Sequence, residues 1–179
     1  MFFYIPLKAK LLLIPFLLIT FFYNLDFRYA PIPKLRNNGI LKIVSVAAVW
    51  SGLIVLIPQM VYQNNLKYEW ILKSLFVFIY ILMLTMSFDQ RDLLIDKQSL
   101  KTLPQRFSAG LKYIYLIFLL ILLILSFYIF KDKELIISIL TIILSVILCS
   151  YSHEKKSFYY TAFWIEAIPV FWYLALHYI

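Results

Sequence analysis

The sequence has few charged residues and almost no cysteine. Lys, Arg, Asp and Glu make up only 15% of its 179 residues, whereas 64% are hydrophobic and 19% are aromatic. A soluble domain of this size could not bury so much apolar surface, since roughly half of the residues are apolar in ordinary globular chains. The single cysteine, Cys149, excludes a disulfide framework and a Cys-rich metal site. The composition therefore predicts a polytopic membrane protein.

The net charge of +8 indicates a membrane surface rather than a nucleic acid as the partner. A nucleic-acid interface needs basic residues clustered on a folded soluble face, but no soluble segment, internal repeat or low-complexity linker stands out. Basic loop residues instead suit the anionic cytoplasmic leaflet. We expect a single transmembrane domain over residues 1–179, embedded in a lipid bilayer and binding no nucleic acid.

Apolar stretches of about 20 residues, the length that crosses a bilayer as a helix, occur six times. They lie at residues 3–24, 40–60, 69–88, 111–130, 134–151 and 158–178. This pattern predicts an all-α membrane helix bundle of about six transmembrane helices. The first span requires Lys8 and Lys10 to snorkel to the interface. A cleaved signal peptide is the alternative, but Arg28, Ala30 and Pro31 offer no small-x-small cleavage site.

The distribution of basic residues predicts the orientation. With the N-terminus outside, most of the 17 Lys and Arg residues fall in cytoplasmic loops, as the positive-inside rule favours. We therefore expect a protein of the plasma (inner) membrane with both ends outside and the loop 89–110 in the cytoplasm.

This loop begins with three regularly spaced carboxylates. Asp89, Asp92 and Asp96 are three and four residues apart, so on a continuous helix they would point the same way. Hard oxygen ligands suit Mg²⁺, which completes its coordination shell with phosphate oxygens. The spacing thus indicates a metal site that could hold a diphosphate. A solvated loop whose acids balance nearby bases is the alternative. Pro104 is expected to end the helical element, because it disfavours helix at Leu103.

The segment FDQRDLLIDKQSLKTLPQRF resembles the second aspartate-rich motif of the UbiA-type membrane prenyltransferases. That motif is commonly written D-x-x-D-x-x-x-D, followed by a basic residue and T-L-P; the glycine that usually stands between them is absent here. Family members are nine-helix bundles, and the chain resembles their helices four to nine. The resemblance therefore implies a partial UbiA-like prenyltransferase fold.

The resemblance also implies roles for individual residues. Asp89, Asp92 and Asp96 would be the catalytic and Mg²⁺-binding carboxylates. The basic residues that bind the diphosphate would be Arg28, Arg91, Lys97 and Lys101. Tyr23 resembles a family tyrosine that precedes a basic residue and would line the substrate pocket. Glu166 is an acid within the last span, where acids are rare, and we expect it either to face this pocket or to form a structural hydrogen bond.

The reaction that the resemblance implies is the Mg²⁺-dependent transfer of an isoprenoid chain from a prenyl diphosphate to a lipophilic or aromatic acceptor. The family's first acidic motif has no counterpart before Asp89, because Asp26 stands alone. Two hypotheses therefore stay open. The chain is an enzyme or part of one, completed by a separate three-helix chain that carries the first motif, or it is a catalytically silent membrane module or scaffold. A small transporter subunit is a third class, but no repeat or broken helix supports it.

Overall fold

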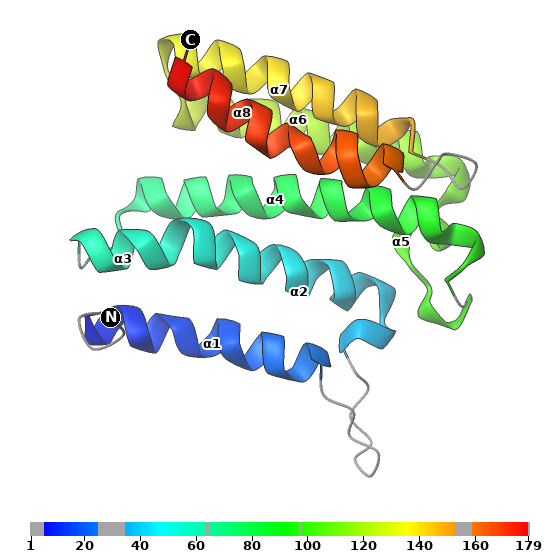
Figure 1. The fold of residues 1–179 in the computed structure, drawn as a ribbon, viewed down its shortest axis with the longest axis horizontal. Helices are drawn as coiled ribbons and strands as arrows, with labels where there is room; N and C mark the ends of the chain where they lie inside the picture. Colours follow the sequence, from blue (N-terminus) through cyan, green and yellow to red (C-terminus); the bar gives the residue numbers. More distant parts are fainter. Residues whose placement is uncertain (1–5, 25–34, 64, 97, 153–158, 179) are drawn as a thin grey trace. The chain divides into compact units, whose positions relative to one another are not determined.

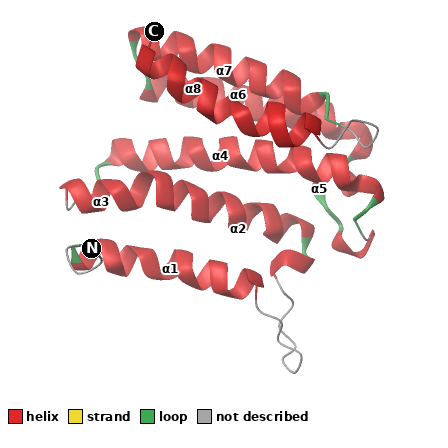
Figure 2. Cartoon of the chain, viewed as in Figure 1, coloured by secondary structure: helices red, strands yellow, loops and turns green. Residues whose placement is uncertain are grey.

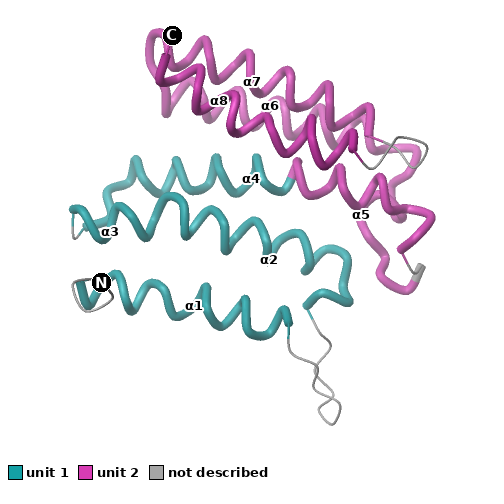
Figure 3. Tube along the Cα trace, in the orientation of Figure 1, with its two compact units in different colours: residues 1–82 teal, residues 83–179 magenta. Residues whose placement is uncertain are grey.

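The computed structural model describes residues 6–24, 35–63, 65–96, 98–152 and 159–178, and every regular element in these ranges is helical (Figures 1 and 2). The α-helices are α1 (Leu7–Asn24), α2 (Gly39–Ser51), α3 (Ile57–Gln63), α4 (Tyr68–Arg91), α5 (Leu103–Arg106), α6 (Leu111–Ile129), α7 (Asp132–Ser150) and α8 (Glu166–Tyr178). The chain forms two compact units, Met1–Leu82 and Met83–Ile179, and the boundary between them falls within α4 (Figure 3).

In the first unit, one helical stretch runs from α2 through the π-helix η3 (Gly52–Leu56) into α3. Asn38 caps its start, since the side-chain oxygen accepts hydrogen bonds from the backbone N–H groups of Ile40 (3.1 Å) and Leu41 (3.3 Å). The π-helical turn precedes Pro58, which has no backbone N–H to donate within a regular α-helix. A single helical stretch of the length needed to cross a membrane therefore contains a local irregularity.

Gly52 allows α1 to approach this irregular turn closely. A Cβ atom at residue 52 would lie 2.1 Å from Cζ of Phe16, which α1 contributes. No side chain fits at that distance without moving the Phe16 ring. The absence of a side chain at Gly52 is therefore what lets the aromatic ring pack there.

The second unit contains a hairpin of α6 and α7, against which α8 packs along α7 (Figure 1). Its core is formed by apolar side chains that are almost completely buried, among them Leu122 on α6, Ile142 on α7 and Ile168 on α8. The π-helix η7 (Tyr160–Ile165) precedes α8, and the Tyr160 hydroxyl donates to the backbone oxygen of Leu148 at 2.8 Å. This bond joins the start of the last helical segment to α7.

Five helical stretches of the described chain are long and apolar enough to cross a membrane: Leu7–Asn24, Gly39–Gln63, Tyr68–Leu94, Ser108–Ile129 and Asp132–Ser150. Many of their large apolar side chains are exposed, as expected of helices that face lipid. The all-helical class and the multi-pass membrane character are thus supported. The sixth expected span, 158–178, overlaps η7 and α8 and is not among the five, which we attribute to the polar residues Glu166 and His177.

Candidate functional site

The expected continuous helix through all three aspartates is wrong. Helix α4 ends at Arg91 and is followed by a 3₁₀ turn, Asp92–Leu94. The backbone oxygen of Asp92 accepts from the N–H groups of Ile95 (2.9 Å) and Asp96 (2.8 Å), and the next described element is the short 3₁₀ helix Gln98–Leu100. After Arg91 the α-helix is therefore replaced by a tighter 3₁₀ turn, so the three aspartates do not follow one regular α-helical period.

Asp89 lies in the last turn of α4, and only 1% of its surface is exposed. Two hydrogen bonds join this turn to other helices of the second unit. The Tyr115 hydroxyl of α6 donates to Oε1 of Gln90 at 3.0 Å, and the Ser152 hydroxyl, just after α7, donates to the backbone oxygen of Ser87 at 2.8 Å. Asp89 is therefore a carboxylate buried within packed helices rather than one presented to a loop.

Asp92 is held by the preceding residue, Arg91. The Nε and Nη2 atoms of Arg91 donate to Oδ1 and Oδ2 of Asp92 at 2.6 and 2.8 Å, while Nη1 donates to Oγ1 of Thr161 at 2.7 Å. Thr161 is fully buried in η7. We call Arg91, Asp92 and Thr161 the arginine clasp. Its bidentate geometry is that of a strong charge-assisted pair, and it joins the end of α4 to a residue 70 positions away.

The T-L-P segment starts a helix, whereas we expected it to end one. Leu103 is the first residue of the short helix α5, and Pro104 follows in its first turn. Proline is tolerated there because the first N–H groups of a helix have no intrahelical partner. Gln105 reinforces the turn: its Oε1 accepts from the N–H of Thr102 at 3.0 Å, and its Nε2 donates to the backbone oxygen of Asp96 at 3.3 Å.

The carboxylates in this arrangement do not fit a three-ligand Mg²⁺ site. Among the residues with described positions, no three His, Cys, Asp or Glu side chains are close enough together to hold a metal ion. Asp89 is buried, Asp92 is bound by Arg91, and Asp96 lies beyond the end of α4. The catalytic role of the three aspartates stays a prediction.

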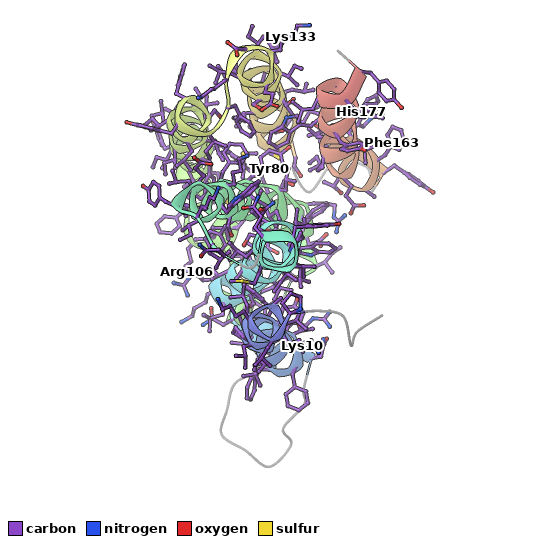
Figure 4. The ribbon with its side chains drawn as sticks, turned by 90° about the vertical axis from the view of Figure 1, so that its left-hand side faces the viewer. Lys10, Tyr80, Arg106, Lys133, Phe163 and His177 are labelled. Atoms are coloured by element: carbon purple, nitrogen blue, oxygen red, sulfur yellow. The ribbon has the colours of Figure 1, made fainter. Side chains whose placement is uncertain are left out.

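Two basic residues of the loop lie on one cavity of about 390 Å³. Its lining residues are Leu93, Lys101, Pro104, Gln105, Arg106 and Ser108. Lys101 has a left-handed backbone, φ 51°, at the turn before α5. The Nε of Arg106 donates to the backbone oxygen of Lys101 at 2.8 Å. Figure 4 labels Arg106, whose side chain is exposed. Arg28 and Lys97, also expected to bind diphosphate, lie outside the described residues.

The two residues expected in a substrate pocket differ in their surroundings. Tyr23 lines an apolar cavity of about 160 Å³ in the first unit, together with α1 residues Ile19 and Thr20 and α2 residues Ser45, Val46, Val49 and Trp50. Glu166 is an exposed residue at the start of α8 in the second unit. Tyr23 therefore does line a cavity, while Glu166 is accessible at the surface of its helix.

Sequence reasoning missed Thr161 and Tyr115 as residues that contact the candidate loop. Thr161 and Tyr115 reach the end of α4 through contacts 70 and 25 positions apart, and no local pattern signals such contacts. Arg106 belongs to the segment that resembles the prenyltransferase motif, but no diphosphate-binding role was predicted for it. No protein-family model, curated protein or solved structure matches the chain.

Proposed function

We propose that the chain recognises a prenyl diphosphate at the loop 89–110, as a UbiA-like prenyltransferase or part of one. The prenyl chain would be transferred to a lipophilic or aromatic acceptor. The observation that carries the proposal is the position of the loop: it overlaps the ends of Tyr68–Leu94 and Ser108–Ile129 and connects these two helical stretches, which are long and apolar enough to cross a membrane. A prenyl diphosphate is similarly divided into an apolar chain and a charged end.

The ligand and this part of the protein match in how their apolar and charged parts are solvated. An isoprenoid chain partitions into lipid along apolar helices, at about 0.8 kcal/mol for each CH₂ group removed from water. The diphosphate must stay where water or basic side chains compensate its charge. The loop carries basic residues at this boundary, including Arg91, Lys101 and Arg106. We place the loop in the cytoplasm of a plasma (inner) membrane protein, because the basic residues favour that side.

Mg²⁺ is the cofactor that the family resemblance implies, and it would neutralise charge on the leaving diphosphate. Since the described carboxylates do not fit a three-ligand site, we derive no step of the reaction through the metal. The chain's own side chains supply charge and hydrogen-bond donors for binding. The arginine clasp holds Asp92, and the bonds of Gln90 and Ser87 hold the last turn of α4 in place.

Limited trypsin digestion in detergent tests this function. Trypsin cuts after Lys and Arg, and the exposed residues Lys101 and Arg106 provide sites in the loop. We expect farnesyl diphosphate to slow cleavage at both residues, while farnesol, which lacks the charged group, should not. Cleavage that is identical with and without farnesyl diphosphate, in buffer containing Mg²⁺, would remove the prenyl-diphosphate proposal.

A catalytically silent module is the second candidate, and the arginine clasp favours it. A carboxylate that is bonded bidentately to Arg91 is not available to a metal until that pair opens. We therefore expect the purified chain with Mg²⁺ to release no diphosphate from farnesyl diphosphate. Release that Asp92→Ala abolishes would instead identify a complete enzyme. Activity only on co-expression with a three-helix chain carrying an acidic motif would identify one part of a split enzyme.

A further inference from the structure

The cavity beside α5 is lined by two cations and by no acid. Lys101 and Arg106 supply the positive charge, and the other four lining residues are apolar or neutral. The loop as a whole contains three aspartates, so this separation of charge is not a consequence of composition alone. Asp92 does not compete for the two cations, because Arg91 already binds it. The lining residues by themselves therefore carry a net positive charge, which favours an anion.

The geometry keeps the two cations together. The left-handed turn at Lys101 and the bond from Arg106 Nε to the Lys101 oxygen hold the guanidinium beside the lysine backbone. That bond uses one of the five N–H donors of the guanidinium. The donors on the two terminal nitrogens take no part in it. Neither Lys101 nor Arg106 forms an ion pair with another residue that the structure describes. Their charges are thus available to a ligand.

If the two neighbouring candidate spans cross a bilayer, the cavity lies at the level of the lipid phosphate groups. Its lining residues Leu93 and Ser108 belong to the ends of the two candidate spans Tyr68–Leu94 and Ser108–Ile129. Lys101 and Arg106 lie outside both spans. The volume of about 390 Å³ is near the lower end of the range for small-molecule sites, roughly 300–1,000 Å³. It is sufficient for a phosphate-bearing group with some water.

We infer that the Lys101–Arg106 cavity is a metal-independent binding site for a phosphate group, held directly by the ammonium and guanidinium groups. The inference rests on the proposed function for the identity of a prenyl substrate, but not for phosphate binding itself. The phosphate comes either from a soluble diphosphate or from an anionic lipid head group. Both offer oxygens that a lysine and an arginine bind through charge-assisted hydrogen bonds.

Calorimetric titration with inorganic diphosphate tests the site, using the full chain in phosphatidylcholine nanodiscs with EDTA present. We expect wild-type binding without Mg²⁺, and a loss of affinity of about tenfold or more for Lys101→Asn or Arg106→Gln. Asn tolerates the left-handed backbone, and Gln keeps a donor for the Lys101 oxygen. Arg106→Lys restores the charge and should recover part of the affinity, which separates loss of charge from loss of structure.

Lys112→Gln is the matched control. Lys112 lies in the first turn of α6, over the Tyr113 ring, and does not line the cavity. We expect this variant to bind like wild type. No binding without Mg²⁺, or an equal loss in the control variant, would overturn the inference. Both results are independent of whether a prenyl chain is recognised.

A second arm identifies the source of the phosphate. Phosphatidylglycerol in the nanodiscs should suppress diphosphate binding if the lipid head group occupies the cavity, and should leave it unchanged if the ligand is soluble. If the cavity binds inorganic diphosphate but farnesyl diphosphate gives no protection from trypsin, the site stands and the proposed function fails. If farnesyl diphosphate protects the loop equally in wild type and in Arg106→Gln, the function stands and the inferred site fails.

Discussion

Removing Arg91 should destabilise the second unit through the arginine clasp. Arg91→Met keeps an unbranched apolar side chain but removes the charge and three hydrogen bonds, two to Asp92 and one to Thr161. The side chains of Arg91 and Asp92 are 15% and 27% exposed, so their pair lies between the surface and buried limits. Surface pairs contribute roughly 0–1 kcal/mol, and removing one partner of a buried pair costs roughly 3–5 kcal/mol.

An intermediate cost of about 2 kcal/mol for the pair and about 1 kcal/mol for the Thr161 bond gives a loss of about 3 kcal/mol in the free energy of unfolding. Reversible unfolding in detergent micelles titrated with SDS, followed by far-ultraviolet circular dichroism, measures this change. The double variant Arg91→Met with Asp92→Asn removes the stranded carboxylate as well. The free energy of unfolding of the double variant should therefore be about 2 kcal/mol higher than that of the single variant.

The coupling between the two substitutions is the decisive quantity. If the two changes are additive, or if Arg91→Met leaves the unfolding free energy unchanged, the clasp contributes nothing to stability. In that case Arg91 would also not keep Asp92 from binding a metal. Circular dichroism before titration provides the control that both variants reach the native helix content.

Further predictions concern packing and topology. Gly52→Ala should lower the free energy of unfolding by about 1–3 kcal/mol, because the new Cβ would lie 2.1 Å from the Phe16 ring. Gly110→Ala should be nearly neutral in the same unfolding assay, because the nearest atom to a Cβ at Gly110 is 3.9 Å away. If the contact is the cause, Phe16→Ala should remove most of the Gly52→Ala effect, and an unchanged effect would contradict it. Single cysteines at Ser99 and Asn65, in a chain without the native cysteine, should react with a membrane-impermeant maleimide from the cytoplasmic and the outer side respectively. The opposite pattern of labelling would reverse the proposed orientation.

The sequence by itself determined the class of the protein and most of its helices. Backbone hydrogen bonds in lipid have to be satisfied within a segment, so an apolar stretch of about 20 residues has few alternatives to a helix. Five of the six expected spans match helices of sufficient length and apolarity for this reason. The charged loop after Tyr68–Leu94 could also be located from the sequence, since charges interrupt the apolar pattern there.

Only the tertiary structure decided how the loop is arranged. The aspartate spacing suggested one continuous helical face, but α4 ends at Arg91 and Asp92 pairs with that residue. A periodic pattern does not by itself show at which residue a helix ends. The Thr161 contact of the clasp and the cavity shared by Lys101 and Arg106 depend on packing and on a left-handed turn. Such contacts between separate elements have no local period, and therefore only the folded chain reveals them.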